Sequence, residues 1–103
     1  MEFSRNVKND AIVIALSGEL DEKSAAATRE YIDKAFFGQR TRRLILDFAK
    51  VSFMDSTGIG MLLGRYKKVS EAGAELCVAN LNAQIDKVFR VSGLYQIIKA
   101  VSL

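Results

Sequence analysis

Short apolar segments rich in β-branched residues recur along the chain, separated by longer stretches with helical periodicity. The clearest is AIVIALS at 11–17, and LILDF at 44–48 and ELCVA at 75–79 repeat the pattern. Apolar runs of this length are typical of strands that are covered on both faces. Strands that alternate with helices favour βαβ units, whose right-handed crossovers produce a mostly parallel sheet.

Three helices are predicted at 21–37, 57–72 and 83–91. The second has the strongest periodicity, because its apolar residues recur at helical spacing along one face. The predicted buried stripe of this helix consists of Ile59, Leu62, Leu63, Tyr66 and Val69.

Two weaker strands complete the expected sheet. Residues 2–8 alternate and precede the turn residues Asn9 and Asp10, which predicts a hairpin with an antiparallel edge strand, and 97–101 predicts a short final strand. The 103 residues suit one hydrophobic core. The expected fold is a single α/β domain over 1–103, with a mostly parallel central sheet of four to five strands, an antiparallel edge strand and three to four helices.

Composition excludes several classes of function. The chain has no histidine, which rules out Ser-His-Asp triads and histidine metal ligands, and its one cysteine, Cys77, lies in an apolar strand that predicts a buried thiol. A net charge of +3 is too small for the basic surface of nucleic-acid readers. No segment approaches the roughly 18 apolar residues of a membrane span. We therefore expect a cytoplasmic protein with no direct nucleic-acid or membrane contacts.

The loops at 18–23, 49–58 and 80–82 follow the predicted central strands, and such loops gather at one edge of a parallel sheet. Ser56 lies in the second loop, near the N-terminus of a helix, where partial positive charge favours a phosphate. Gly60 and its neighbour Gly58 would let another protein's active site approach this hydroxyl, although each glycine costs about 1 kcal/mol of helix stability.

The alternative interpretation of this loop is purely structural. Ser56 or Asp55 would then only cap the helix, a role that stabilises a protein by typically ~1 kcal/mol. Capping alone would be the preferred interpretation of Asp55 and Ser56, but the two glycines shift the balance, because a first turn built only for stability would contain better helix formers.

The segment FMDSTGIGMLLGRYKKV at 53–69 closely resembles the anti-sigma-factor antagonists of the STAS domain family, with the sporulation-type member as the nearest relative. The likeness extends to LSGELD at 16–21, LILDF at 44–48 and VSGLYQII at 91–98. It therefore spans nearly the whole chain.

This resemblance implies roles for individual residues. The family's phosphoacceptor is the serine after the aspartate in an Asp-Ser-Ser/Thr-Gly motif, which is Ser56 here, with Asp55, Thr57 and Gly58 around it. Thr57 replaces a second serine that many members have. Asp21 matches a family position near the phosphorylated serine, although capping of the first helix explains it equally well.

The resemblance also implies a partner-switching regulator of transcription. The unmodified protein would bind an anti-sigma factor and thereby release a sigma factor. The anti-sigma factor, a serine kinase with bound ATP or ADP, would phosphorylate Ser56 and end the association, and a serine phosphatase would reverse the modification. The chain would not be an enzyme and would need no cofactor of its own.

Gly60, Met61, Arg65 and Lys68 are candidate partner contacts. The last three continue from Gly58 along the helix face opposite the apolar stripe, and an exposed methionine beside cations suits a docking surface. A solvated helix face is the more frequent arrangement for such residues.

Two other functions stay open. A STAS module of a stress-signalling scaffold or a transporter-regulating assembly would carry the same serine. A small nucleotide-binding hydrolase would use Asp55 and Ser56, but the chain lacks histidine and a phosphate-binding loop. The glycines at 58, 60 and 64 depart from the dinucleotide-binding pattern as well.

Overall fold

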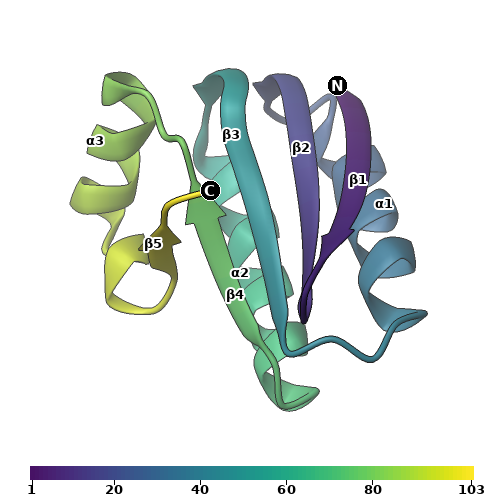
Figure 1. Ribbon diagram of the computed structural model, residues 1–103. Helices are drawn as coiled ribbons and strands as arrows, with labels where there is room; N and C mark the ends of the chain where they lie inside the picture. The colour runs from purple at the N-terminus through teal and green to yellow at the C-terminus, as the bar shows by residue number, and fades with distance from the viewer.

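Five strands form one mixed sheet, and three helices pack on one of its faces (Figure 1). The computed structural model describes all residues from 1 to 103. In chain order the elements are β1 (Glu2–Lys8), β2 (Ala11–Leu20), α1 (Ala25–Phe37), β3 (Arg43–Met54), α2 (Ser56–Glu71), β4 (Glu75–Ala79), α3 (Ala83–Ser92), the short 3-10 helix η1 (Leu94–Gln96) and β5 (Lys99–Val101).

The strand order is β1-β2-β3-β4-β5, and it confirms the predicted topology. β1 pairs antiparallel with β2, whereas the remaining neighbours pair in parallel. The hairpin between β1 and β2 turns at Asn9, whose φ of 57° is the left-handed conformation that asparagine tolerates. Each parallel connection crosses through one of the helices.

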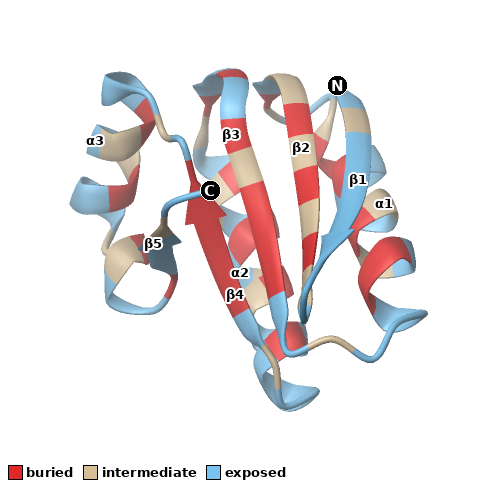
Figure 2. Cartoon of the chain, viewed as in Figure 1, coloured by how far each residue is buried: buried red, intermediate tan, exposed pale blue.

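The hydrophobic core lies on one side of the sheet, which corrects the expectation of strands covered on both faces. One cluster of 22 buried residues joins the inner face of the strands to all three helices. In β2 the buried residues alternate with half-buried ones, as Figure 2 shows by its colour bands. The other face has only a small buried cluster, formed by Ile45, Cys77 and Ala79. Cys77 is fully buried, as the sequence predicts.

Two strands are longer than their apolar segments. β3 continues to Met54, so the predicted loop at 49–58 is wrong, and β2 continues through Gly18 to Leu20. The two strands keep pairing in parallel over this extension, with two irregularities in register near Gly18, whose φ is +125°. Polar side chains on the uncovered face break the apolar pattern there without ending the strands.

The first helix begins at Ala25 instead of residue 21, because the preceding residues form a turn. The Asp21 carboxylate accepts hydrogen bonds from the backbone N–H groups of Lys23 and Ser24, at 3.0 and 3.1 Å. Ser24 occupies the N-cap position, but its hydroxyl donates to the Glu19 carbonyl at 2.6 Å and does not cap the helix.

Candidate functional site

The carboxyl ends of β2 and β3 lie side by side, and an aspartate follows each of them. Leu20 pairs with Met54 in the sheet, and the backbone N–H of Asp55 donates to the Leu20 carbonyl oxygen at 3.3 Å. Asp55 is the only residue between β3 and α2. The first turn of α2 is therefore fixed directly to the sheet, next to the turn that begins at Asp21.

Asp55 caps α2. Its Oδ1 atom accepts hydrogen bonds from the backbone N–H groups of Thr57 and Gly58, at 2.9 and 3.2 Å, and its backbone is extended, as expected of an N-cap residue. This settles which of the two candidate residues stabilises the helix end. Ser56 is the first residue inside the helix and has no capping role.

The Ser56 side chain is exposed, and its hydroxyl forms no hydrogen bond within the protein. It lies in the first turn of a 16-residue helix, where the helix dipole stabilises negative charge. The hydroxyl is thus accessible to a phosphoryl donor, and a phosphate formed on it would lie at the favourable end of the helix. Thr57, its neighbour, is exposed as well.

Gly58 serves the fold and not the access that the sequence suggests, so that part of the interpretation is wrong. It is buried, and a Cβ atom added to it would lie 2.7 Å from the Met54 side chain and 2.9 Å from the Leu20 carbonyl oxygen. The absence of a side chain allows α2 to begin against the ends of β2 and β3. Gly60 differs, because it is exposed and an added Cβ would meet no atom within 4 Å.

Asp21 lies at the same edge of the sheet as Asp55, but its carboxylate is used within its own turn. Its backbone carbonyl accepts the N–H of Ala25 at the start of α1. Its role near a phosphoserine stays a prediction.

The predicted exposure of Met61 and Arg65 is wrong. Their exposed fractions are 6% and 5%, because this face of α2 packs toward α1. Arg65 is buried as an ion pair, with its Nε atom 2.9 Å from an oxygen of Asp33 on α1. Lys68 reaches the other oxygen of Asp33 at 3.5 Å and stays half exposed. Only Gly60 and Lys68 of the four candidate contacts are at the surface.

An apolar surface beside Ser56 escaped the sequence analysis. Ile59 of α2 and Val88 and Val91 of α3 line a crevice of about 290 Å³, together with Lys87 and Ser92. We call it the α2–α3 crevice. Val91 is 78% exposed, and Leu63, assigned to the buried stripe, is 42% exposed. The sequence could have indicated this surface, because Ile59 and Leu63 follow Ser56 at i+3 and i+7 and therefore lie on the same face of the helix.

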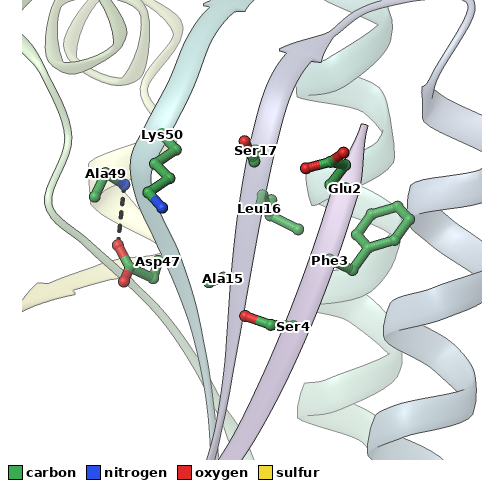
Figure 3. A pocket seen from close by; sticks show the side chains of 9 residues that line it. All are labelled: Glu2, Phe3, Ser4, Ala15, Leu16, Ser17, Asp47, Ala49 and Lys50. Carbon is green, nitrogen blue, oxygen red and sulfur yellow. Dashed lines mark hydrogen bonds between the residues drawn. The ribbon is translucent and has the colours of Figure 1, made fainter.

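A second hollow lies on the uncovered face of the sheet, over β1, β2 and β3 (Figure 3). Its volume is about 330 Å³, and Asp47 and Lys50 are among the side chains that line it. Asp47 is already used, since its Oδ1 atom accepts the N–H of Ala49 at 2.9 Å and the side-chain amide of Asn80 at 3.0 Å. We assign this hollow no role.

The chain has no group of three or more acidic or cysteine side chains placed to hold a metal ion. None of its helices combines the length and the hydropathy that crossing a bilayer requires.

Comparison with known proteins identifies a family and several relatives of this chain. Residues 2–102 match the STAS domain. The anti-sigma F factor antagonist of Paenibacillus polymyxa is 34% identical over 97 residues, which cover 94% of this chain and 80% of that protein. The anti-sigma-B factor antagonist of Bacillus subtilis is 37% identical over 92 residues, which cover 88% and 81% of the two chains.

The structural likeness covers the same length. The anti-sigma factor antagonist SpoIIAA in its unphosphorylated form matches with a TM-score of 0.80 at 32% identity, over 97% of this chain and 88% of that one. The phosphorylated form of SpoIIAA, a Bacillus cell fate determinant, matches with a TM-score of 0.72 at 32% identity, over 97% and 91%. Sequence and fold agree from end to end, and the chain belongs to the STAS domain family.

Proposed function

We propose that this chain is an anti-sigma-factor antagonist that acts by association and is not an enzyme. Relatives at 34% and 37% identity are named as antagonists of anti-sigma F and anti-sigma-B factors, and they support this class of function. The partner is an anti-sigma factor, and its capture releases a sigma factor for transcription. The sporulation type of pathway is the one that we favour.

The association is switched at Ser56. The anti-sigma factor, which is also a serine kinase, uses its bound ATP: the Ser56 oxygen forms a bond to the γ-phosphorus as the bond to ADP breaks, and the hydroxyl proton passes to a base of the kinase. A serine phosphatase hydrolyses the phosphoserine and restores binding. The observation that carries this proposal is the exposed, unbonded hydroxyl of Ser56 in the first turn of α2. A relative that is known in both phosphorylated and unphosphorylated forms supports it.

The surface around Ser56 explains why a phosphate would end binding. The α2–α3 crevice and the exposed Leu63 offer apolar area beside the hydroxyl. A phosphate adds about −1.5 to −2 charges next to the Asp55 carboxylate. A partner that covers this surface would have to desolvate that charge, which costs several kcal/mol unless the partner supplies cations.

The phosphoacceptor is tested by incubating the purified chain with the anti-sigma kinase encoded in the same genome and ATP. We expect one added phosphate, mapped to Ser56 by mass spectrometry and lost in Ser56→Ala. Thr57→Val is the matched control, because Thr57 is the exposed hydroxyl next to it, and this variant should be labelled like the wild type. Undiminished labelling of Ser56→Ala would refute the assignment.

The switch is tested by the affinity for the same anti-sigma factor, measured by isothermal titration calorimetry. Ser56→Asp places one negative charge at the site and should weaken binding by at least about tenfold, whereas Ser56→Ala should bind like the wild type. Equal affinities of the two variants would contradict a switch based on charge.

A further inference from the structure

A groove of about 450 Å³ separates the N-terminal halves of α1 and α2. We call it the α1–α2 groove. Small residues keep it open, since Ala25 and Ala26 line it on α1, and Gly60 and Gly64 line it on α2. A Cβ atom at either glycine would meet nothing within 4 Å, so neither is required by packing within the chain.

Arg65 lines this groove although it is 95% buried, with an exposed fraction of 5%. Asp33 is the only carboxylate in ion-pair distance of its guanidinium, and it also serves Lys68. Nε lies 2.9 Å from Asp33 without the alignment of a hydrogen bond, and Nη1 has no hydrogen-bond partner in the protein. A buried guanidinium with unused N–H groups is costly, because such groups lose their water without replacement.

Arg29 supplies a second cation to the same groove. It is exposed and forms no ion pair within the chain. Burial is the main reason why the pKa of Arg65 lies below its ordinary value; the Asp33 carboxylate opposes this shift, and the charge of Arg29 adds to it. Glu22 is the one acidic residue in the lining, so the groove combines two arginines with a single carboxylate of its own.

We propose that the α1–α2 groove receives an acidic side chain of the anti-sigma factor, whose carboxylate pairs with Arg29 and with the charge of Arg65. The inference rests on the proposed function, because it assigns a second contact to the same partner. Thr57 lines the groove and adjoins Ser56, so the groove lies within reach of a protein that contacts Ser56. A carboxylate complements the planar donor groups of arginine, and one of these arginines has no counter-ion in the chain.

The test is the affinity of the anti-sigma factor for two variants of the full chain. Arg29→Gln removes the exposed cation, and Gly64→Leu fills the groove from a position where the chain has space. We expect each to raise the Kd by at least about tenfold, and Arg29→Gln to reduce the dependence of the Kd on salt. Lys67→Gln, an exposed cation of α2 outside the groove, should change the Kd by less than about twofold. Circular dichroism spectra like that of the wild type, and melting temperatures no lower than its own, would show that the variants fold.

The outcomes distinguish a failure of the groove inference from a failure of the proposed function. If the wild type binds, Ser56→Asp does not, and both groove variants bind like the wild type, the groove inference is wrong and the proposed function stands. If Gly64→Leu weakens binding but Arg29→Gln does not, the occupant is not acidic and the inference is again overturned. If the wild type does not bind the anti-sigma factor at all, both fail.

Discussion

Gly58 and Gly60 lie two residues apart in α2 and have opposite relations to their surroundings. An added Cβ at Gly58 would lie within 3 Å of both a side chain and a backbone carbonyl, whereas at Gly60 it would point into open space. One glycine is needed for the helix to meet the sheet. The other lines the α1–α2 groove and leaves it open, at some cost in helix stability.

This contrast predicts changes of opposite sign in the free energy of unfolding. Gly58→Ala should lower it by about 1–3 kcal/mol, because the methyl group overpacks the contact with Met54 and Leu20. Gly60→Ala should raise it by up to about 1 kcal/mol, through the better helix propensity of alanine. Urea denaturation of the two variants and the wild type measures both values. A gain in stability from Gly58→Ala would show that the helix does not begin against the strands as described.

The sequence alone does not determine which residue caps α2 or what Gly58 contributes. Asp and Ser are both favoured N-caps, so the types alone could not assign the cap to Asp55. The assignment depends on where β3 ends, and that is decided by pairing with β2 far away in the chain. The role of Gly58 likewise depends on Leu20, which no local pattern brings near it.

For the secondary-structure elements, the residue range of α2 could be predicted from the sequence, but the face that it buries could not. The periodicity gave a helix at 57–72, close to the observed Ser56–Glu71. The buried face, however, includes Met61 and Arg65 and leaves Leu63 exposed. A rule that charged residues face water fails here, because Asp33 of α1 forms an ion pair with Arg65 inside the helix interface.

The exposed apolar side chains of α2 and α3 predict a surface that contributes to association and not to folding. Val91→Asp, at a residue that is 78% exposed, should weaken binding of the anti-sigma factor by at least about tenfold while changing stability by less than about 0.5 kcal/mol. Val7→Asp is the matched control, because Val7 is 56% exposed and lies on β1, away from the crevice. Calorimetric titration and thermal melting of both variants provide the measurements. Equal affinities would remove the α2–α3 crevice from the docking surface.

For the whole molecule, the topology followed from the order of strands and helices, whereas the coverage of the sheet did not. Apolar runs such as 11–17 resemble strands buried on both faces, yet all three helices contribute to the core on one face. Residues such as Val13 on the other face are half-buried by neighbouring strands and side chains. Apolar residues can be partly buried without a second layer of helices. The apolar pattern of a single strand therefore does not show whether helices cover one face of the sheet or both.

Two weakly acidic groups predict how the stability of the whole molecule depends on pH. Burial, reinforced by Glu75, raises the pKa of Cys77 from 9.0 to about 11, and burial, reinforced by a hydrogen bond to Asp86, raises the pKa of Tyr95 from 10.0 to about 12. Both groups ionise more readily in the unfolded chain. Their stabilising effect is therefore complete below about pH 9 and is lost as the pH rises through about 11 and then about 12.

Urea denaturation between about pH 8 and pH 12 measures this loss. The free energy of unfolding should decline with a smaller slope in Cys77→Ala and in Tyr95→Phe than in the wild type, even if both variants start from a lower value. Parallel curves for the three proteins would show that neither group is responsible.

The junction of a single residue between β3 and α2 has one more consequence. Asp55 is held to the strand by its own N–H and to the helix by its side chain, so the backbone has no slack in which to rearrange when its neighbour is modified. A phosphate on Ser56 would then change the charge of this surface but not the course of the backbone. A binding partner would have to respond to the phosphate itself. The backbone of the modified or of the unmodified form would serve equally well for docking that partner.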